Sequence, residues 1–477
     1  MNLKEKTASG LLWAAMNNGM MQLLNMVIGI FLGRLLTPND YALVGMIAIF
    51  SAIASTLQES GFTSALINNP KPSDKEYNSV FWFSLMVGVV LYSLLFACAP
   101  LIAAFFNQEC LVGITRVSFL SILLSAIGIV PTAYLNKYLL VKETAIMRVS
   151  TLAISGVAGV AMALNGYAYW SLVTQQLLYV GLLSVGKFFL IPWRPSFSFD
   201  MKPIREMLGF SSKVMVTNIV NQVANNILSF IFGKLFPLRM VGNFTQSYKW
   251  NNMASSLVAG TISQVAQPVF AAMNDNPDKQ LAVLRKMMRF TSLMAFPAML
   301  GLAVVANEFI IILISDKWAG CVPMLQVLCM GGAFLPLYQP LQNLLISRGR
   351  SDLFMWANIS QLVVQIALVL LTSRHGFMFM IVVYSFVNMA WLIVWQQMVR
   401  RVVPIGLYAL AKDVVPFLVI AIVACAVACL VAIPLQGLFL KLIVKLLVGA
   451  ASYYIMVRAC GATILKESVN YLLRRKL

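Results

Sequence analysis

The 477 residues are 60% hydrophobic and only 11% charged, with a mean hydropathy of +0.84. This composition excludes an ordinary soluble domain, in which about a quarter of the residues are charged. The net charge of +19 would suggest nucleic acid on a soluble protein, but here Lys and Arg lie in short segments between apolar runs, so nucleic acid is excluded as a partner. Seven Cys and the single His375 form no metal or disulfide pattern.

Apolar runs of near-membrane length predict an all-α membrane protein with fourteen transmembrane helices. The segment Thr37-Pro38-Asn39, between the first two runs, predicts a turn and a helix start. The predicted spans cover residues 10–36, 41–67, 79–106, 111–135, 146–165, 168–191, 209–232, 250–271, 290–314, 321–346, 353–373, 376–399, 415–434 and 440–460.

The longest predicted loop divides the chain into two six-helix lobes and a remainder. Residues 1–195 form the N-terminal lobe with spans 1–6, 196–208 a cytoplasmic linker, 209–402 the C-terminal lobe with spans 7–12, and 403–477 spans 13 and 14 with a basic amphipathic tail. Roughly three quarters of the 35 Lys and Arg fall on the same side of the predicted membrane as the N-terminus. Because positive charge accumulates on the cytoplasmic side, both termini are expected in the cytoplasm.

Spans 1 and 7 are copies of one pattern. "NNGMMQLLNMVIGIFLGRLL" begins at Asn17 and "TNIVNQVANNILSFIFGKLF" at Thr217. The matched positions are Asn18 with Asn218, Gln22 with Gln222, Asn25 with Asn225, Gly33 with Gly233, and Arg34 with Lys234. An even number of spans separates the copies, so the repeat is parallel, as in transporters built from two halves around a central cleft.

The amides of each copy form a polar stripe on an otherwise apolar helix. Asn218, Gln222 and Asn225 lie within about 60° of one another around the helix axis, and Asn221 widens the arc. Lipid cannot satisfy these donors and acceptors, so the stripes face protein or water. Two roles remain open: hydrogen bonds between neighbouring helices, or the lining of a polar cavity for a hydroxyl-rich ligand.

Five charged residues near the spans are further site predictions. Arg34 and Lys234, at the outer ends of spans 1 and 7, either reach the lipid headgroups or attract an anionic group such as a pyrophosphate. Lys249 is a weaker candidate of the same kind. Glu59 either neutralises a cation, carries a coupling proton or is solvated, and Arg116 marks either an interface or a site.

No nucleotide-binding loop or catalytic motif is present, so an enzyme is not expected. No cofactor is expected either, although H⁺ or Na⁺ could be coupled to transport.

Several stretches resemble the Wzx-type polysaccharide flippases of the MOP superfamily, which also contains the MATE exporters and lipid II flippases. They are "KEKTASGLLWAAMNNGMMQLLNMVIGIFLGRLLTPNDYALVGM", "LQESGFTSALI", "IVPTAYLNKYLLVKE", "SSLVAGTISQVAQPVFAAM" and "LQVLCMGGAFLPLYQPLQNLLISRGRSDL". The resemblance runs from the N-terminus to about Asp352 and weakens beyond it.

The resemblance implies two six-helix lobes around a cleft with spans 13 and 14 peripheral. It also implies a substrate, an oligosaccharide on undecaprenyl pyrophosphate, that alternating access moves from the cytoplasmic to the periplasmic leaflet of the inner membrane. Such a flippase would serve lipopolysaccharide O-antigen or another surface glycan, beside a polysaccharide polymerase and a chain-length regulator. The alternative is a MATE-like, ion-coupled exporter of small amphiphilic molecules.

Overall fold

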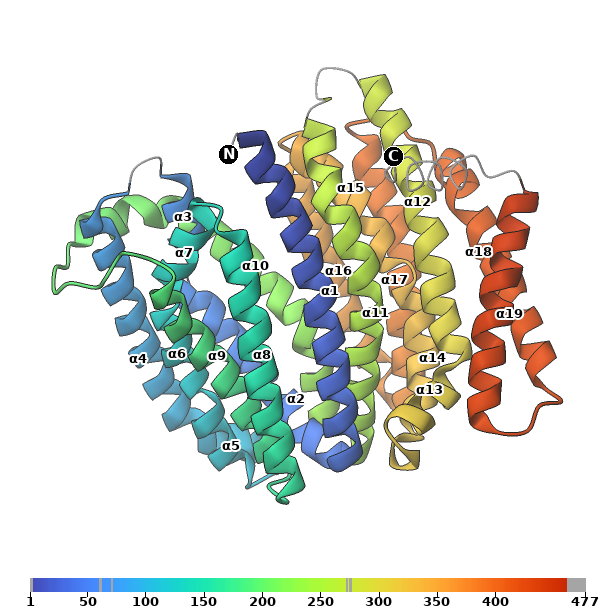
Figure 1. Ribbon diagram of the computed structural model, residues 1–477, viewed down its shortest axis with the longest axis horizontal. Coiled ribbons are helices and arrows are strands. Elements are labelled where there is room, and N and C mark those ends of the chain that lie inside the picture. Colours follow the sequence, from blue (N-terminus) through green and yellow to red (C-terminus); the bar gives the residue numbers. More distant parts are fainter. Residues whose placement is uncertain (1–2, 60–61, 70–71, 272, 274–276, 461–477) are drawn as a thin grey trace. The chain divides into compact units, whose positions relative to one another are not determined.

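The computed structural model describes residues 3–59, 62–69, 72–271, 273 and 277–460, and every regular element in these ranges is a helix. The chain divides into two compact units, Met1–Thr245 and Gln246–Leu477. In each unit the long helices form a bundle (Figure 1). The predicted basic C-terminal tail lies outside the described residues, and the predicted lobe boundaries stay predictions.

The first unit contains ten helices and the beginning of an eleventh. They are α1 (Leu3–Leu35), α2 (Pro38–Glu59), α3 (Phe62–Asn68), α4 (Asp74–Phe106), α5 (Leu111–Ser118), α6 (Leu120–Ile127), α7 (Ile129–Lys137), α8 (Val141–Leu164), α9 (Trp170–Phe189), α10 (Met201–Leu235) and α11 (Leu238–Ala271).

The second unit takes over within α11 and continues to the end of the described chain. Its further helices are α12 (Pro277–Val304), α13 (Ala306–Leu313), α14 (Cys321–Gly332), α15 (Leu335–Ser347), α16 (Ser351–Leu371), α17 (Phe377–Arg400), α18 (Leu407–Ala432) and α19 (Leu438–Ala459), with two short 3₁₀ helices, η1 (Asp316–Trp318) and η2 (Ser373–His375).

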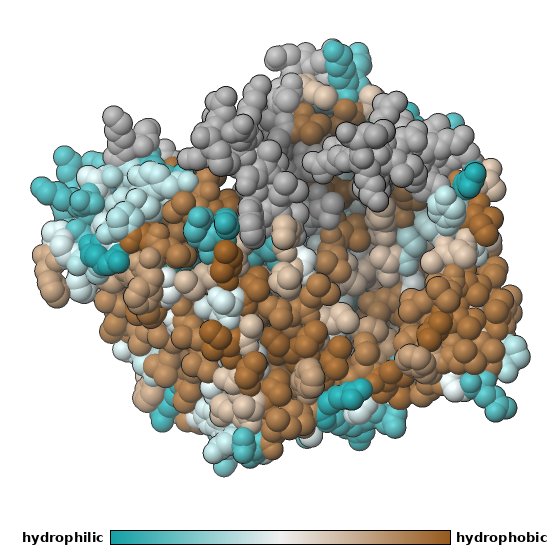
Figure 2. All heavy atoms as spheres, in the orientation of Figure 1, coloured by the Kyte–Doolittle hydropathy of each residue, from teal (hydrophilic) through white to brown (hydrophobic). Residues whose placement is uncertain are grey.

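The multi-pass membrane prediction is confirmed, but the count of fourteen is not. Within the described ranges, 10 helices are long and apolar enough to cross a membrane, or 11 if the bent pair Leu111–Ile127 and Ile129–Lys137 is one span. The long helices α1, α10 and α11 are not among them, although they have 33, 35 and 34 residues. On the visible face, hydrophobic side chains gather in a broad middle region, and hydrophilic ones gather toward its edges (Figure 2).

The predicted helix start near Pro38 is confirmed. Thr37 donates two hydrogen bonds to Oδ2 of Asp40, from its backbone N (2.8 Å) and from its hydroxyl (2.7 Å), and α2 begins at Pro38. Proline suits the first turn because its missing N–H has no partner there in any case.

Side chains of α2 and α4 pack closely against the backbone of α10 in the first unit. A Cβ atom on Gly233 would lie 2.6 Å from Cγ of Met46 and 3.1 Å from the ring of Phe106. Glycine at this position of the sequence repeat therefore leaves room for the buried side chains of Met46 and Phe106. The C-terminal half of α10 thus packs against α2, and α2 lines three of the hollows in this unit.

A bend of 44° separates α6 from α7 at Gly128. The backbone N of Gly128 donates to the carbonyl of Ser125 (2.9 Å), a tight 3₁₀ turn, and Pro131 lacks the N–H that an unbroken helix would use. The bend brings Gly128 against α9, where an added Cβ would lie 2.7 Å from Oγ of Ser184.

In the second unit, ion pairs fix the hairpin of α18 and α19. Asp413, on α18, is buried and accepts hydrogen bonds from Nε of Arg285 (2.7 Å) and Nε of Arg289 (2.6 Å), both on α12. On α19, the ammonium of Lys445 lies 2.6 Å from Oε1 of Glu308, on α13, and both side chains are largely buried. These contacts tie the hairpin to the rest of its unit.

Glu308→Ala is expected to destabilise the second unit by about 3–5 kcal/mol, because it leaves the Lys445 ammonium buried without its carboxylate. The double variant Glu308→Leu with Lys445→Met should recover most of the loss, since no charge then remains. Thermal unfolding in detergent measures both. Equal stability of the single variant and the wild type would contradict the prediction.

Candidate functional site

Three adjoining hollows run through the first unit. The largest has a volume of about 460 Å³ and lies between α1, α2, α8 and α9. Its polar lining is Asn25, Tyr41, Gln175, Gln176, Tyr179 and Thr245. Half of its twelve lining residues thus carry an amide or a hydroxyl, and the other half are apolar side chains or glycine.

The second hollow, of about 190 Å³, adjoins the first and shares Val44, Ala48 and Gln176 with it. Five serines line it: Ser51, Ser55, Ser118, Ser121 and Ser125. Ser51 and Ser55 are one turn apart on α2, and the other three follow one face of α5 and α6.

The third hollow, of about 210 Å³, adjoins the second and shares Ser55, Ser125 and Val180 with it. Of the three hollows, this one is lined by charged side chains, Glu59 from α2 and Lys187 from α9. We call the three hollows together the polar groove.

One buried amide joins the two walls of the groove. Nε2 of Gln58 donates to the carbonyl of Ile122 (2.6 Å), and Oε1 of Gln58 accepts from the hydroxyl of Ser125 (2.7 Å). Gly88, on α4, leaves room for this amide, because a Cβ there would lie 2.8 Å from Nε2. The side chain is 1% exposed, so its hydrogen bonds fix α6 against α2 beside the groove.

The lining suits a neutral, hydroxyl-rich ligand. Hydroxyls and side-chain amides both donate and accept hydrogen bonds, and they impose no charge-burial cost. The described residues contain no group of three or more His, Cys, Asp or Glu side chains that could hold a metal ion.

Two of the predicted site residues line the polar groove. Asn25, from the α1 stripe, lines the first hollow, and Glu59 lines the third, where its side chain is exposed. Asn18 is exposed and Gln22 half-buried on the same helix. Whether the α1 stripe binds a ligand stays a prediction.

The second stripe lies along α10. Asn218 and Asn225 are exposed, while Asn221 and Gln222 are half-buried. The neighbouring Asn226 donates to the backbone carbonyl of Gln222 (2.9 Å), one turn earlier on its own helix. The role of this stripe also stays a prediction.

Lys234 and Arg34 are both exposed at the C-terminal ends of their helices. The ammonium of Lys234 donates to the carbonyl of Phe105 (2.5 Å) and lies 4.6 Å from the centre of that ring. It thus contacts the last turn of α4, where a cation also complements the helix dipole. This contact gives Lys234 a structural role, whatever it does for a substrate.

Arg116 and Lys249 are the remaining predicted cations. The guanidinium of Arg116, on α5, lies 4.3 Å from the centre of the Phe96 ring, and its Nε is buried without a hydrogen-bond partner among the described residues. Lys249 is half-buried on α11, in the second unit.

Most of the groove was missed in the sequence because its residues are serines and amides of ordinary membrane helices. Gln175, Gln176 and Lys187 stand in the run "TQQLLYVGLLSVGK" of α9. The spacing of Ser118, Ser121 and Ser125 by three and four residues is a helical stripe and could have indicated a polar face.

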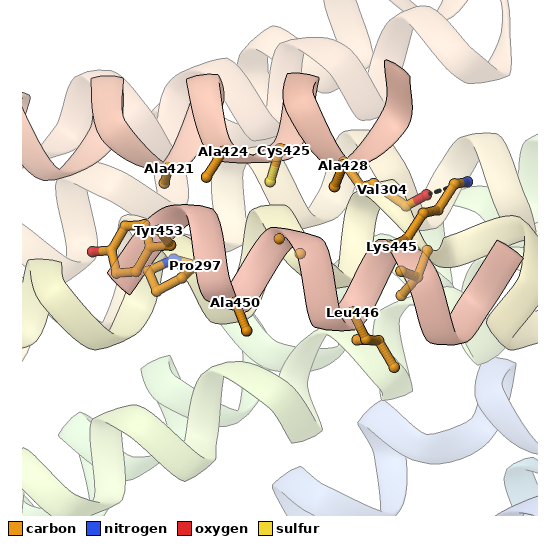
Figure 3. Close-up of a pocket in the computed structure, with 13 residues that line it drawn as sticks. Pro297, Val304, Ala421, Ala424, Cys425, Ala428, Lys445, Leu446, Ala450 and Tyr453 are labelled. Atoms are coloured by element: carbon orange, nitrogen blue, oxygen red, sulfur yellow. Dashed lines mark hydrogen bonds between the residues drawn. The ribbon is translucent and has the colours of Figure 1, made fainter. Parts of the chain in front are cut away.

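The second unit has a hollow of different chemistry. About 260 Å³ lie between α12, α18 and α19, lined mainly by small apolar side chains such as Ala421, Ala424 and Ala428. At one end Lys445 donates to the carbonyl of Val304 (3.1 Å), shown as a dashed line in Figure 3. An alkyl chain would fit this lining better than a sugar would.

Gly128→Ala is expected to destabilise the first unit by about 1–3 kcal/mol, because the new methyl group collides with Ser184 of α9. Adding Ser184→Gly should recover part of the loss. Gly301→Ala is the matched control, since a Cβ there meets no atom within 4 Å. Thermal unfolding in detergent compares the three, and equal stability of Gly128→Ala and Gly301→Ala would contradict the assigned collision.

The chain is similar in sequence to proteins of polysaccharide biosynthesis. The sequence profile of a family described as "Polysaccharide biosynthesis protein" matches residues 31–323. The teichuronic acid biosynthesis protein TuaB of Bacillus subtilis is 24% identical over 88% of this chain and 88% of its own. The lipopolysaccharide biosynthesis protein WzxC of Escherichia coli is 24% identical over 75% of this chain and 73% of its own.

The fold is shared with a solved transporter structure. The lipid II flippase MurJ, in an inward closed conformation, superposes with a TM-score of 0.76 at 15% sequence identity, over 95% of this chain and 100% of that chain. Similarity at this level of identity establishes the fold, which is the fold expected from the sequence resemblance.

Proposed function

Because the chain belongs to the polysaccharide biosynthesis protein family, we propose that it is a flippase that moves an oligosaccharide linked to a polyprenyl pyrophosphate across the membrane. Relatives named for teichuronic acid and lipopolysaccharide biosynthesis, and the fold of a lipid II flippase, support this class of substrate. The protein is a transporter rather than an enzyme.

The observation that carries the proposal is the polar groove. A glycan presents many hydroxyls, and an apolar membrane offers them no partners, so crossing requires a lining that replaces water. The serines and amides of α2, α6 and α9 provide such a lining within one unit. The polyprenyl chain is itself apolar and stays in lipid.

The orientation follows from the distribution of positive charge: the protein spans the inner membrane with both termini in the cytoplasm. Adding α1, α10 and α11 to the 11 apolar spans gives fourteen spans. These spans form two six-helix lobes around a cleft, with α18 and α19 peripheral. Alternating access exposes the substrate first to the cytoplasmic side and then to the periplasmic side. Coupling to H⁺ or Na⁺, and a polymerase with its chain-length regulator as partners, complete the proposal.

Gln176→Leu tests the groove with little change in side-chain volume. Gln176 lines both the first and the second hollow, and losing its hydrogen bonds to substrate should cost about 1 kcal/mol or more, roughly a fivefold or greater loss of export. Surface polysaccharide is measured in a strain lacking the native gene, at equal protein levels. Gln397→Leu, the same change at an exposed position of α17, is the control and should export normally.

Arg34→Ala combined with Lys234→Ala tests the paired cations of the repeat. If they attract the pyrophosphate, export should be abolished at normal protein levels, because two charge-assisted contacts are removed. Arg239→Ala, at another exposed cation, is the control. Unchanged export by the double variant would remove both cations from the mechanism. Unchanged surface glycan in the gene deletion, with a new drug sensitivity, would instead favour an exporter of small amphiphilic molecules.

A further inference from the structure

The third hollow of the groove differs from the other two because it contains a buried ammonium. Lys187, in the last turn of α9, is 8% exposed and lines this hollow with the hydroxyls of Ser55, Thr63 and Ser184. A lysine held in such a place is costly unless its charge has a partner.

The hydrogen bonds of Lys187 leave most of its donor capacity unused. Its Nζ donates to the hydroxyl oxygen of Thr132 (2.8 Å), and Thr132 in turn donates to the carbonyl of Gly128 (2.6 Å). Thr132 is therefore fixed as an acceptor at the bend between α6 and α7. An ammonium has three donors, and no other residue in the described part of the chain accepts a hydrogen bond from this one.

The ammonium of Lys187 has charged neighbours but no ion pair among the described residues. Glu59, which lines the same hollow, and Arg148, which does not line it, both interact with Lys187 electrostatically. None of the described carboxylates forms a salt bridge with Lys187. The hollow therefore combines a lining of hydroxyls with a buried ammonium that has no described carboxylate within salt-bridge distance.

Resting on the proposed function, we propose that this hollow binds a single carboxylate of an acidic sugar in the oligosaccharide. The volume of about 210 Å³ has room for roughly seven water molecules, the scale of one sugar ring. The surrounding hydroxyls receive the ring hydroxyls, and Lys187 neutralises the carboxylate. Lys187 is thus a specificity-determining residue that favours acidic over neutral glycans.

A pyrophosphate fits the hollow less well than a carboxylate does. It carries more than one negative charge and is commonly bound by several cations or by the planar fork of arginine. Here one lysine faces the hollow, and the carboxylate of Glu59 lines the same space and would repel a polyanion. A single carboxylate needs only the one ammonium that faces the hollow, and Glu59 repels it less than it repels a polyanion.

The test measures binding to the full chain in nanodiscs of uncharged phosphatidylcholine. The probes are hyaluronan tetrasaccharide, which carries carboxylates, and chitotetraose, which is neutral, with inorganic pyrophosphate as competitor. The wild type should bind the hyaluronan tetrasaccharide at least tenfold more tightly than chitotetraose. Lys187→Gln should reduce this preference to less than threefold, whereas Lys202→Gln, at an exposed cation at the start of α10, should leave it unchanged.

Three results overturn the inference: no preference or no binding of the acidic probe by the wild type, a preference that survives in Lys187→Gln, or competition by pyrophosphate that depends on Lys187. The last would assign the site to the carrier. If chitotetraose binds without any preference for the acidic probe and export depends on the gene, this inference fails while the proposed flippase stands. If neither probe binds and deletion of the gene leaves surface glycan unchanged, the proposed function fails too.

Discussion

The amide of Gln58 illustrates the constraint on which the first unit depends: a polar group between membrane helices must be satisfied by protein or by a ligand. Its two hydrogen bonds, to the carbonyl of Ile122 and from the hydroxyl of Ser125, hold α6 beside α2. The second and third hollows meet near this contact, sharing Ser55 and Ser125. Satisfying one buried amide thus also positions hydroxyls that are available to a substrate.

Most of the buried charged groups discussed above are paired with an opposite charge of the protein. Asp413 is bound by two arginines and Glu308 by Lys445, so these buried carboxylates are paired within the protein and stabilise the α18–α19 hairpin. Lys187 is the contrasting case, because its described partner is a neutral hydroxyl. A charge that the fold leaves uncompensated beside a cavity is more informative about a ligand than a charge that the fold has paired.

The two units contain hollows of different chemistry. The groove of the first unit presents serines and amides, and the hollow of the second presents alanines and other small apolar groups. In the proposed function the hydroxyl-rich part of a lipid-linked glycan suits the lining of the groove, while the polyprenyl chain stays in lipid.

The sequence by itself determined the membrane class, the helical fold and the family, because long apolar runs have few alternatives in lipid and local motifs are readable residue by residue. It also predicted the helix start at Pro38 correctly. Only the tertiary structure decided which polar residues share a cavity. Asn25, Ser55 and Lys187 come from three helices, α1, α2 and α9, and the bend at Gly128 and the Gln58 contact bring the walls of the groove together. Side-chain pairing across helices depends on packing angles and close contacts, such as that of Gly233 with Met46, which no local pattern specifies.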